Sequence, residues 1–286
     1  MAGLGVAVVP PMYLRSRPFS GGSDGSDGTD RAVKRELTTQ DLELAWQCVG
    51  AAARSYSMVT IENNLCHVLQ VPLVMGPPWW KKVNIIACRG SDSLRDVVTD
   101  LEIGLVDLGI ARVHAGFWKS ANSILDQVLK LDQTALPAPV VLCGHSKGAD
   151  EAKILAWQLA RCGRPVAAVH TFGGPRIGDA GWRRTYNAQK ANFDLQTLGD
   201  ITTRWVHEED IVARLLAWIT GYRHVGHEAF MSSFGGVEMD PPLWAKGLSD
   251  LWGTFWGYER GHIELIEDHP VSRYVEHLKG LTEKNA

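Results

Sequence analysis

Short apolar runs alternate along the chain with segments of helical periodicity. Three runs, rich in β-branched residues, are typical of buried strands: "VNIIAC" (83–88), "APVVLCG" (138–144) and "PVAAVHTFG" (165–173). Two more, "TTRWVHEED" (202–210) and "RHVGHEAF" (223–230), indicate further strands. The pattern therefore predicts a sheet built from several short strands.

Helical segments separate these runs. One starts at the capping residues Thr38 and Thr39, and another follows Ser146 and stops at Gly163. A Trp-rich stretch (241–261) is expected to be partly helical, and a last helix begins near Pro270. This alternation predicts an α/β fold with a mainly parallel central sheet and helices on both faces. Ligands of such sheets bind beyond the carboxyl ends of the strands.

Composition limits the number of domains, the possible partners and the roles of the cysteines. The chain has 286 residues, of which 45% are hydrophobic, enough for one α/β domain. A formal charge of -3 makes nucleic acid an unexpected partner. The five cysteines form no CxxC pair, and Cys88 and Cys143 are expected to be small buried apolar residues.

The N-terminal residues read as a tail rather than as part of the core. Residues 15–31, "RSRPFSGGSDGSDGTDR", are too polar to pack, so 1–37 is predicted to be a flexible tail and 38–286 a single domain. No apolar run reaches 18 residues, so no transmembrane segment is expected. The start lacks a typical secretory signal, which suggests a cytoplasmic protein or one exported without a cleaved signal.

The pentapeptide "GHSKG" places Ser146 between Gly144 and Gly148, where a predicted strand becomes a helix. A sharp strand-turn-helix lifts a serine oxygen above the sheet and strains its backbone, so the residues two positions away must be small. The helix starting near Lys147 directs free N–H groups toward this point. Ser146 is therefore a candidate nucleophile; the alternative is a surface turn with a helix-capping serine.

A base and an orienting acid follow such a serine in chain order. His269 is the favoured base because it lies on a loop before the last helix, and His262 is the reserve. Asp210 is the favoured acid, with Glu209 beside it as a fallback. Asp179 competes for the role of acid but suits a turn or a helix cap better.

The other histidines suit structural roles. His170 lies in a predicted strand and is expected in the core, and His277 lies within a predicted helix. His224 and His227 are three apart, which on a strand directs them to opposite sides. No metal or other cofactor is therefore expected.

Six ordered segments resemble the class 3 lipases, a family of triacylglycerol lipases, phospholipases A1 and related esterases. The resemblance covers roughly residues 41–281. The segments are "VNIIACRGSDSLRDVVTDL", "VHAGF", "VVLCGHSKGAD", "HTFGGPRIGD", "RWVHEEDIVARL" with "YRHVGHE", and "DHPVSRY". The resemblance implies the α/β-hydrolase fold and a serine hydrolase acting on lipid esters, with Ser146, Asp210 and His269 as the triad.

The resemblance also implies an oxyanion hole made by Ser91 and the backbone N–H of Lys147, and a lid between 92 and 103. Three departures leave the substrate open. Lys147 replaces the usual leucine and could favour an anionic lipid, Val97 replaces a common lid tryptophan, and Ala213 replaces a frequent proline.

Six apolar residues at near-helical spacing precede His269. They are expected either in the core or at an acyl site or lipid-facing surface: Trp244, Leu248, Leu251, Trp252, Phe255 and Trp256. The expected partner is a lipid or other ester, which leaves room for transient contact with a membrane. Two other functions are compatible with the sequence, namely a catalytically silent lipid-binding protein and an acyltransferase.

Overall fold

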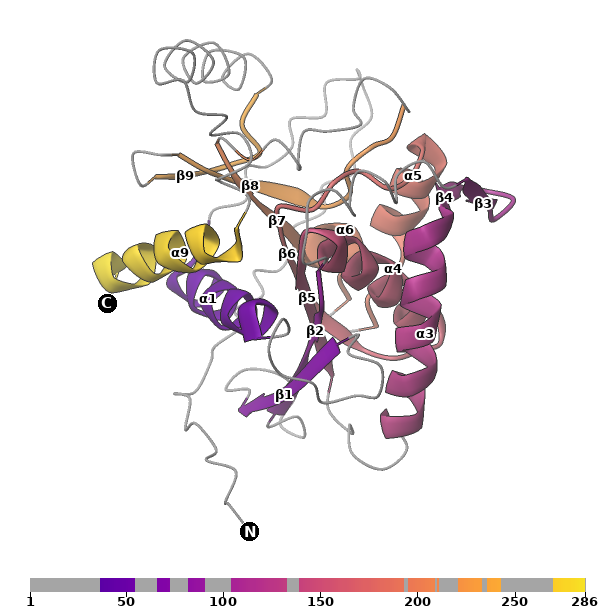
Figure 1. Cartoon of the computed structure of the whole chain (residues 1–286), viewed down its shortest axis with the longest axis horizontal. Helices are drawn as coiled ribbons and strands as arrows, with labels where there is room; N and C mark the ends of the chain where they lie inside the picture. Colours follow the sequence, from indigo (N-terminus) through magenta and orange to yellow (C-terminus); the bar gives the residue numbers. More distant parts are fainter. Residues whose placement is uncertain are drawn as a thin grey trace.

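The computed structural model describes the residues that form the sheet and its main covering helices. They are 37–54, 66–72, 82–90, 104–132, 139–192, 195–208, 210, 221–232, 236–242 and 270–285. The predicted tail (1–37) lies outside them, apart from its last residue, as do the lid segment and the Trp-rich stretch from 243 onward. Figure 1 shows the whole arrangement.

A seven-stranded sheet forms the centre of the molecule, in the order β1-β2-β5-β6-β7-β8-β9. Its strands are β1 (Cys66–Pro72), β2 (Lys82–Cys88), β5 (Val140–His145), β6 (Val166–Phe172), β7 (Thr202–His207), β8 (His227–Met231) and β9 (Val237–Met239). The strands from β2 to β8 pair in parallel, and the two outer strands pair antiparallel. The predicted mainly parallel sheet is confirmed.

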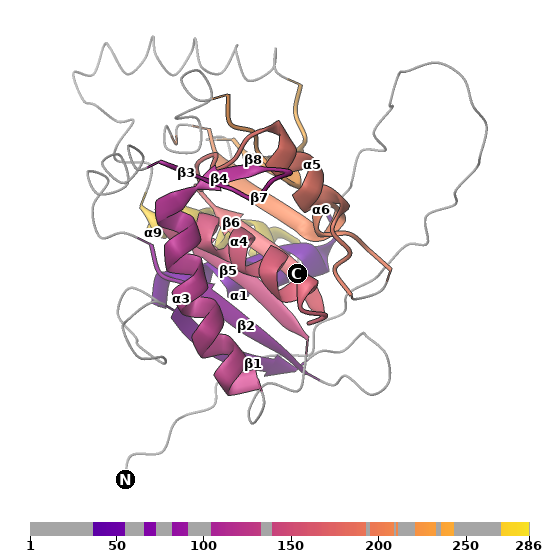
Figure 2. The same ribbon diagram turned by 90° about the vertical axis from the view of Figure 1, so that its right-hand side faces the viewer.

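Helices cover both faces of this sheet, and a small hairpin lies beside it. The remaining elements are α1 (Thr39–Arg54), α3 (Ala115–Asp132), α4 (Lys147–Arg161), α5 (Ala180–Ala188), α6 (Leu198–Ile201), α9 (Val271–Asn285), and the hairpin strands β3 (Leu105–Asp107) and β4 (Arg112–His114). In Figure 1, α1 and α9 lie on one side of the sheet, and α3, α4 and α5 lie on the other. Figure 2 shows the same layers from the side.

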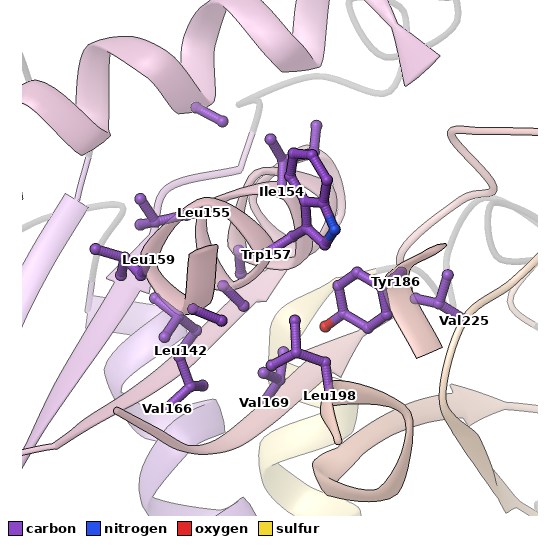
Figure 3. Packing of buried hydrophobic residues seen from close by; sticks show 14 of the residues in the cluster. Leu142, Ile154, Leu155, Trp157, Leu159, Val166, Val169, Tyr186, Leu198 and Val225 are labelled. Carbon is purple, nitrogen blue, oxygen red and sulfur yellow. The ribbon is translucent and has the colours of Figure 1, made fainter. Parts of the chain in front are cut away.

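Strand β5 shows why the sheet must be covered twice. Val140 and Leu142 belong to the core beneath α3 and α4, whereas Val141 and Cys143 belong to the core beneath α1 and α9. All four side chains are fully buried, because consecutive residues of a strand point to opposite faces. Figure 3 shows the first of these cores, where residues of α4 pack on Leu142 and Val169 of the sheet.

Two predicted elements are shifted. The strand predicted at 223–230 begins only at His227, because Gly226 adopts a φ of 64° that turns the chain. The last helix begins at Val271, with Pro270 just before it. No helix in the described ranges is long and apolar enough to span a membrane.

Candidate active site

Ser146 lies between the end of β5 and the start of α4, with an unusual backbone conformation. Its φ is 56° and its ψ is -126°, a region that non-glycine residues rarely adopt. The backbone N–H of Ser146 donates to the carbonyl of Phe172 at the end of β6, at 3.0 Å. The side chain makes no capping hydrogen bond to α4 and is 2% exposed. The alternative of a helix-capping surface serine is therefore wrong.

The glycines on either side are needed for close approach. A Cβ on Gly144 would lie 2.2 Å from the carbonyl oxygen of Gly148, and a Cβ on Gly148 would lie 2.3 Å from that of Cys88. Both distances are too short for any side chain, so the sequence requirement inferred from "GHSKG" is met. The second contact also sets the start of α4 against the end of β2.

Lys147 is the first residue of α4, so its backbone N–H is among those that have no acceptor within the helix. Its ammonium lies 3.5 Å from the carboxylate of Glu151, one turn later. Glu151 is 1% exposed, whereas the Lys147 side chain is 27% exposed. The cation beside the candidate nucleophile therefore has a buried counter-charge.

A second ion pair lies deeper in the first turns of α4. The ammonium of Lys153 pairs with the carboxylate of Asp150, and it donates to the carbonyl of Pro175 at 3.1 Å. Burial raises the pKa of the Asp150 carboxyl to about 7 and lowers the pKa of the Lys153 ammonium. This pair ties α4 to the chain that leaves β6.

Asp210 lies three residues beyond the end of β7, two strands away from Ser146 in the sheet. It is fully buried, and its backbone N–H donates to the carbonyl of His207 at 3.1 Å. The hydroxyl of Tyr274, in α9, donates to the Asp210 carboxylate at 2.6 Å. A buried carboxylate thus stands at the same edge of the sheet as the strained serine.

Tyr274 was not identified from the sequence. Its ring lies against the last residues of three neighbouring strands, with centroid distances of 5.9 Å to His145, 6.0 Å to Phe172 and 6.4 Å to His207. Its hydroxyl also accepts the backbone N–H of His207 at 3.2 Å. The only sequence signal was an aromatic residue in the predicted last helix, shortly after His269.

Several predicted residues lie outside the described part of the chain. These are the favoured base His269, its reserve His262, the oxyanion residue Ser91 and the fallback acid Glu209. The lid (92–103) and the six apolar residues from Trp244 to Trp256 also lie outside it. The described chain resumes at Pro270, directly after His269.

The competing residues have structural roles. Asp179 caps α5, where its carboxylate accepts the N–H of Trp182 at 2.9 Å, so its predicted capping role is confirmed. His170 is a core residue that accepts a hydrogen bond from the indole of Trp205 at 3.1 Å. His227 pairs with Asp240 at 2.7 Å. Among the described residues, no group of three or more His, Cys, Asp or Glu side chains could hold a metal ion.

Comparison with known proteins shows which family the central part of the chain resembles. The sequence profile described as "Lipase (class 3)" matches residues 85–219, which include the strained serine and the buried acid. Residues 85–219 are therefore similar to the class 3 lipase family. The predicted resemblance is confirmed.

A curated relative of the matched segment is also named a lipase. The secreted mono- and diacylglycerol lipase A of Penicillium cyclopium is 32% identical over 158 residues, which are 52% of this chain and 48% of that protein. The chain therefore spans about half the length of this curated relative.

Solved structures show that the fold extends beyond the matched segment. The Rhizomucor miehei lipase in its propeptide complex aligns over 78% of this chain and 80% of its own, with a TM-score of 0.54 and 20% identity. A structure described as a triacylglycerol lipase with a serine protease triad as its catalytic centre aligns over 72% and 85%, with a TM-score of 0.53 and 20% identity. The predicted α/β-hydrolase fold is confirmed.

Proposed function

We propose that this protein is a serine hydrolase that cleaves carboxylic esters of lipids, and that residues 38–286 form its single catalytic domain. The observation that carries the proposal is the strained backbone of Ser146, which is buried between two glycines at the carboxyl edge of the sheet. Such strain is maintained at functional sites, where it presents a reactive group. The match of the surrounding residues 85–219 to the class 3 lipase model supports ester hydrolysis as the reaction.

Ser146, His269 and Asp210 would act together. His269 takes the proton of Ser146 as the serine oxygen attacks the ester carbonyl, and Asp210 fixes the imidazole and stabilises its cation. The histidine then gives this proton to the alcohol oxygen as the ester C–O bond breaks, which leaves an acyl-enzyme. The neutral histidine next takes a proton from the attacking water and returns it to the Ser146 oxygen as the acid leaves. Two facts support this assignment: Asp210 is fully buried, and Tyr274 joins it to the helix that starts two residues after His269.

The negative oxygen of the tetrahedral intermediate would rest on the backbone N–H groups of Lys147 and Ser91. The place of Lys147 at the first position of α4 supports its part, because that N–H has no partner within the helix. Removing one such donor costs about 3–4 kcal/mol of barrier.

Acylglycerols are the favoured substrates within this class. The Penicillium relative is named as a mono- and diacylglycerol lipase, and its substrates lack a charged headgroup. Glu151 partly neutralises Lys147 in this chain, which weakens the case for an anionic ester at the reacting centre. Phospholipid cleavage of the A1 type is the second possibility within the same reaction.

Labelling with a fluorophosphonate tests the nucleophile. Ser146→Ala should abolish labelling, and the exposed helical serine variant Ser123→Ala should retain it. Labelling that persists in Ser146→Ala would refute the assignment.

A lipid panel then tests the substrate. Monoacylglycerol, diacylglycerol, triacylglycerol, phosphatidylcholine and phosphatidylglycerol are compared, each with the Ser146→Ala control. Fatty acid released from acylglycerols supports the proposal, transfer of the acyl group to an added alcohol supports an acyltransferase, and lipid binding without turnover supports a silent protein.

A further inference from the structure

The first turns of α4 carry two buried acidic side chains close to the proposed nucleophile. Asp150 and Glu151 follow Ser146 within five residues, and both are buried. The N–H groups at the start of this helix favour a negative charge placed beyond them, which is why they suit an oxyanion. A carboxylate within the same turn repels that negative charge. The charge of these acids therefore affects the proposed reaction.

Each acid has a cation from the same helix. Lys147 pairs with Glu151, and Lys153 pairs with Asp150. The first pair is partly open to solvent, which screens its charges, whereas both members of the second pair are fully buried. Burial raises the pKa of the Asp150 carboxyl to about 7 against the opposing effect of Lys153, and the charge of Glu151 adds to the rise. The charge of Asp150 thus acts at close to full strength wherever it is not neutralised.

Other charged groups act on this pair from the neighbouring elements. Burial lowers the pKa of the Lys153 ammonium, and the positive charges of Arg204 in β7 and of Arg176 after β6 lower it as well. Arg204 is itself paired with the buried carboxylate of Glu228 in β8, at 3.0 Å. Lys153 attracts the Asp150 carboxylate both as a charge and as a hydrogen-bond donor. Lys153 therefore supplies the positive charge that offsets Asp150.

The pair is held at a fixed place relative to Ser146. The Lys153 ammonium donates to the carbonyl of Pro175 at 3.1 Å, and the backbone N–H of Ser146 donates to the carbonyl of Phe172 at 3.0 Å. A Cβ on Gly174, which lies between these two acceptors, would be 3.7 Å from the same ammonium. One short segment after β6 therefore contacts both the serine turn and the ion pair, where α4 packs on β5 and β6 (Figure 2).

We propose that Lys153 is a positioning residue for ester cleavage: its ammonium offsets the Asp150 carboxylate, so that the start of α4 keeps its attraction for the oxyanion that forms when Ser146 attacks. The proposal rests on the proposed function, because it names a residue that acts on the same transition state through Asp150. Without the ammonium, an ionised carboxylate in this buried turn would oppose the developing negative charge and slow cleavage about tenfold.

The pH dependence of kcat on a soluble short-chain ester tests this role. In Lys153→Met the Asp150 carboxyl loses the cation that lowers its pKa, so it stays protonated and neutral at low pH and ionises only as the pH rises further. We expect the ratio of variant to wild-type kcat to be near one at about pH 6 and to fall about tenfold by about pH 9, with KM nearly unchanged.

A second substitution should rescue the first. Asp150→Asn combined with Lys153→Met removes the carboxylate that needs the ammonium, so the double variant should recover most of the wild-type kcat at about pH 9. Rates are expressed per folded molecule, measured by circular dichroism at each pH, because these substitutions also change stability. A loss in Lys153→Met that is equal at all pH values and is not recovered in the double variant would overturn the proposal.

Arg204→Met is the matched control. It leaves the buried carboxylate of Glu228 without its ion-pair partner, as Lys153→Met does for Asp150. Glu228 lies on β8, however, three strands away from β5 in the sheet. The control should therefore lose stability but keep the wild-type pH profile of kcat. The same fall in kcat with rising pH in both variants would overturn the proposal.

The wild-type rate separates this proposal from the proposed function. If the wild-type chain cleaves the ester, Ser146→Ala does not, and Lys153→Met follows the wild type at every pH, the positioning role fails while the function stands. If the wild-type chain cleaves no ester, or cleaves it no faster than Ser146→Ala, the proposed function fails and the positioning role fails with it.

Discussion

The hydroxyl of Tyr274 donates a 2.6 Å hydrogen bond to the carboxylate of Asp210, from a residue 64 positions later in the chain. The ring of the same side chain lies against His145, the residue before Ser146. Tyr274 belongs to α9, which starts two residues after His269. One buried side chain therefore links the proposed acid, the strand of the proposed nucleophile and the helix next to the proposed base.

Replacing Tyr274 by phenylalanine removes the hydroxyl and keeps the ring. A hydrogen bond to a charged group contributes roughly 1.5–3 kcal/mol. We expect kcat to fall about tenfold to a hundredfold with KM nearly unchanged, because Asp210 loses orientation while the substrate site keeps its shape. Steady-state kinetics on a soluble ester measures both constants.

Tyr186→Phe is the matched control. Tyr186 is also fully buried, and its hydroxyl hydrogen-bonds the hydroxyl of Thr202 at 2.8 Å, away from Asp210. This variant should lose stability to a comparable degree but keep its kcat. If both variants lower kcat equally, Tyr274 acts only through stability.

The glycines around Ser146 give a second prediction. In Gly148→Ala the new methyl group would meet the carbonyl oxygen of Cys88 at 2.3 Å, so the turn or the end of β2 must shift. We expect ester cleavage to fall at least about a hundredfold, since a misplacement of about 1 Å costs that much. Gly280→Ala is the control, because a Cβ there meets nothing within 4 Å and alanine favours the α9 helix. Full activity in Gly148→Ala would contradict the requirement for close approach.

The Lys147–Glu151 pair gives a third prediction, about the charge of the substrate. Glu151→Gln removes the counter-charge, so kcat/KM for a carboxylate-bearing ester, relative to a neutral one, should rise about three- to tenfold. Lys147→Met should lower the same ratio. Lys279 and Glu283 form an exposed pair with the same spacing on α9, and Glu283→Gln should leave the ratio unaltered. A ratio unaffected by either change at 147 or 151 would show that the cation does not reach the substrate.

The central strands could be predicted from the sequence because their burial leaves a plain signal. The runs at 138–144 and 165–173 are apolar throughout, as expected of strands covered on both faces, and they form β5 and β6. Cys88 and Cys143 are buried as predicted. The serine turn could be predicted for a different reason. Both glycines lie within two residues of Ser146, and they are needed because a side chain at either position would clash with the backbone.

Contacts between distant residues could not be predicted in this way. Nothing near Tyr274 in the sequence indicates that its hydroxyl meets Asp210, because that contact depends on how α9 packs against the sheet. The start of β8 was placed too early because "RHVGHEAF" has strand-like composition throughout, whereas the left-handed φ of Gly226 breaks it. The edge strands β1 and β9 carried no distinct pattern and were not predicted.

The buried pair of Asp150 and Lys153 gives a final prediction, on stability and pH. Burial raises the pKa of the Asp150 carboxyl from 3.8 to about 7, so between about pH 4 and pH 7 the folded protein holds a proton that the unfolded chain has released. The contribution of this carboxyl to stability therefore falls as the pH rises through that window and is constant above it.

The ammonium of Lys153 lowers the pKa of the Asp150 carboxyl. Lys153→Met removes this ammonium, so the pKa of Asp150 should rise and the pH window over which stability falls should extend upward. We expect the variant to lose about 3–5 kcal/mol of unfolding free energy near pH 8 and clearly less near pH 5, as measured by denaturant unfolding. Asp150→Asn combined with Lys153→Met buries no charge, so its stability relative to wild type should vary less with pH than that of Lys153→Met. An equal loss in Lys153→Met at both pH values would show that the Asp150 carboxyl does not take up a proton when its partner is removed.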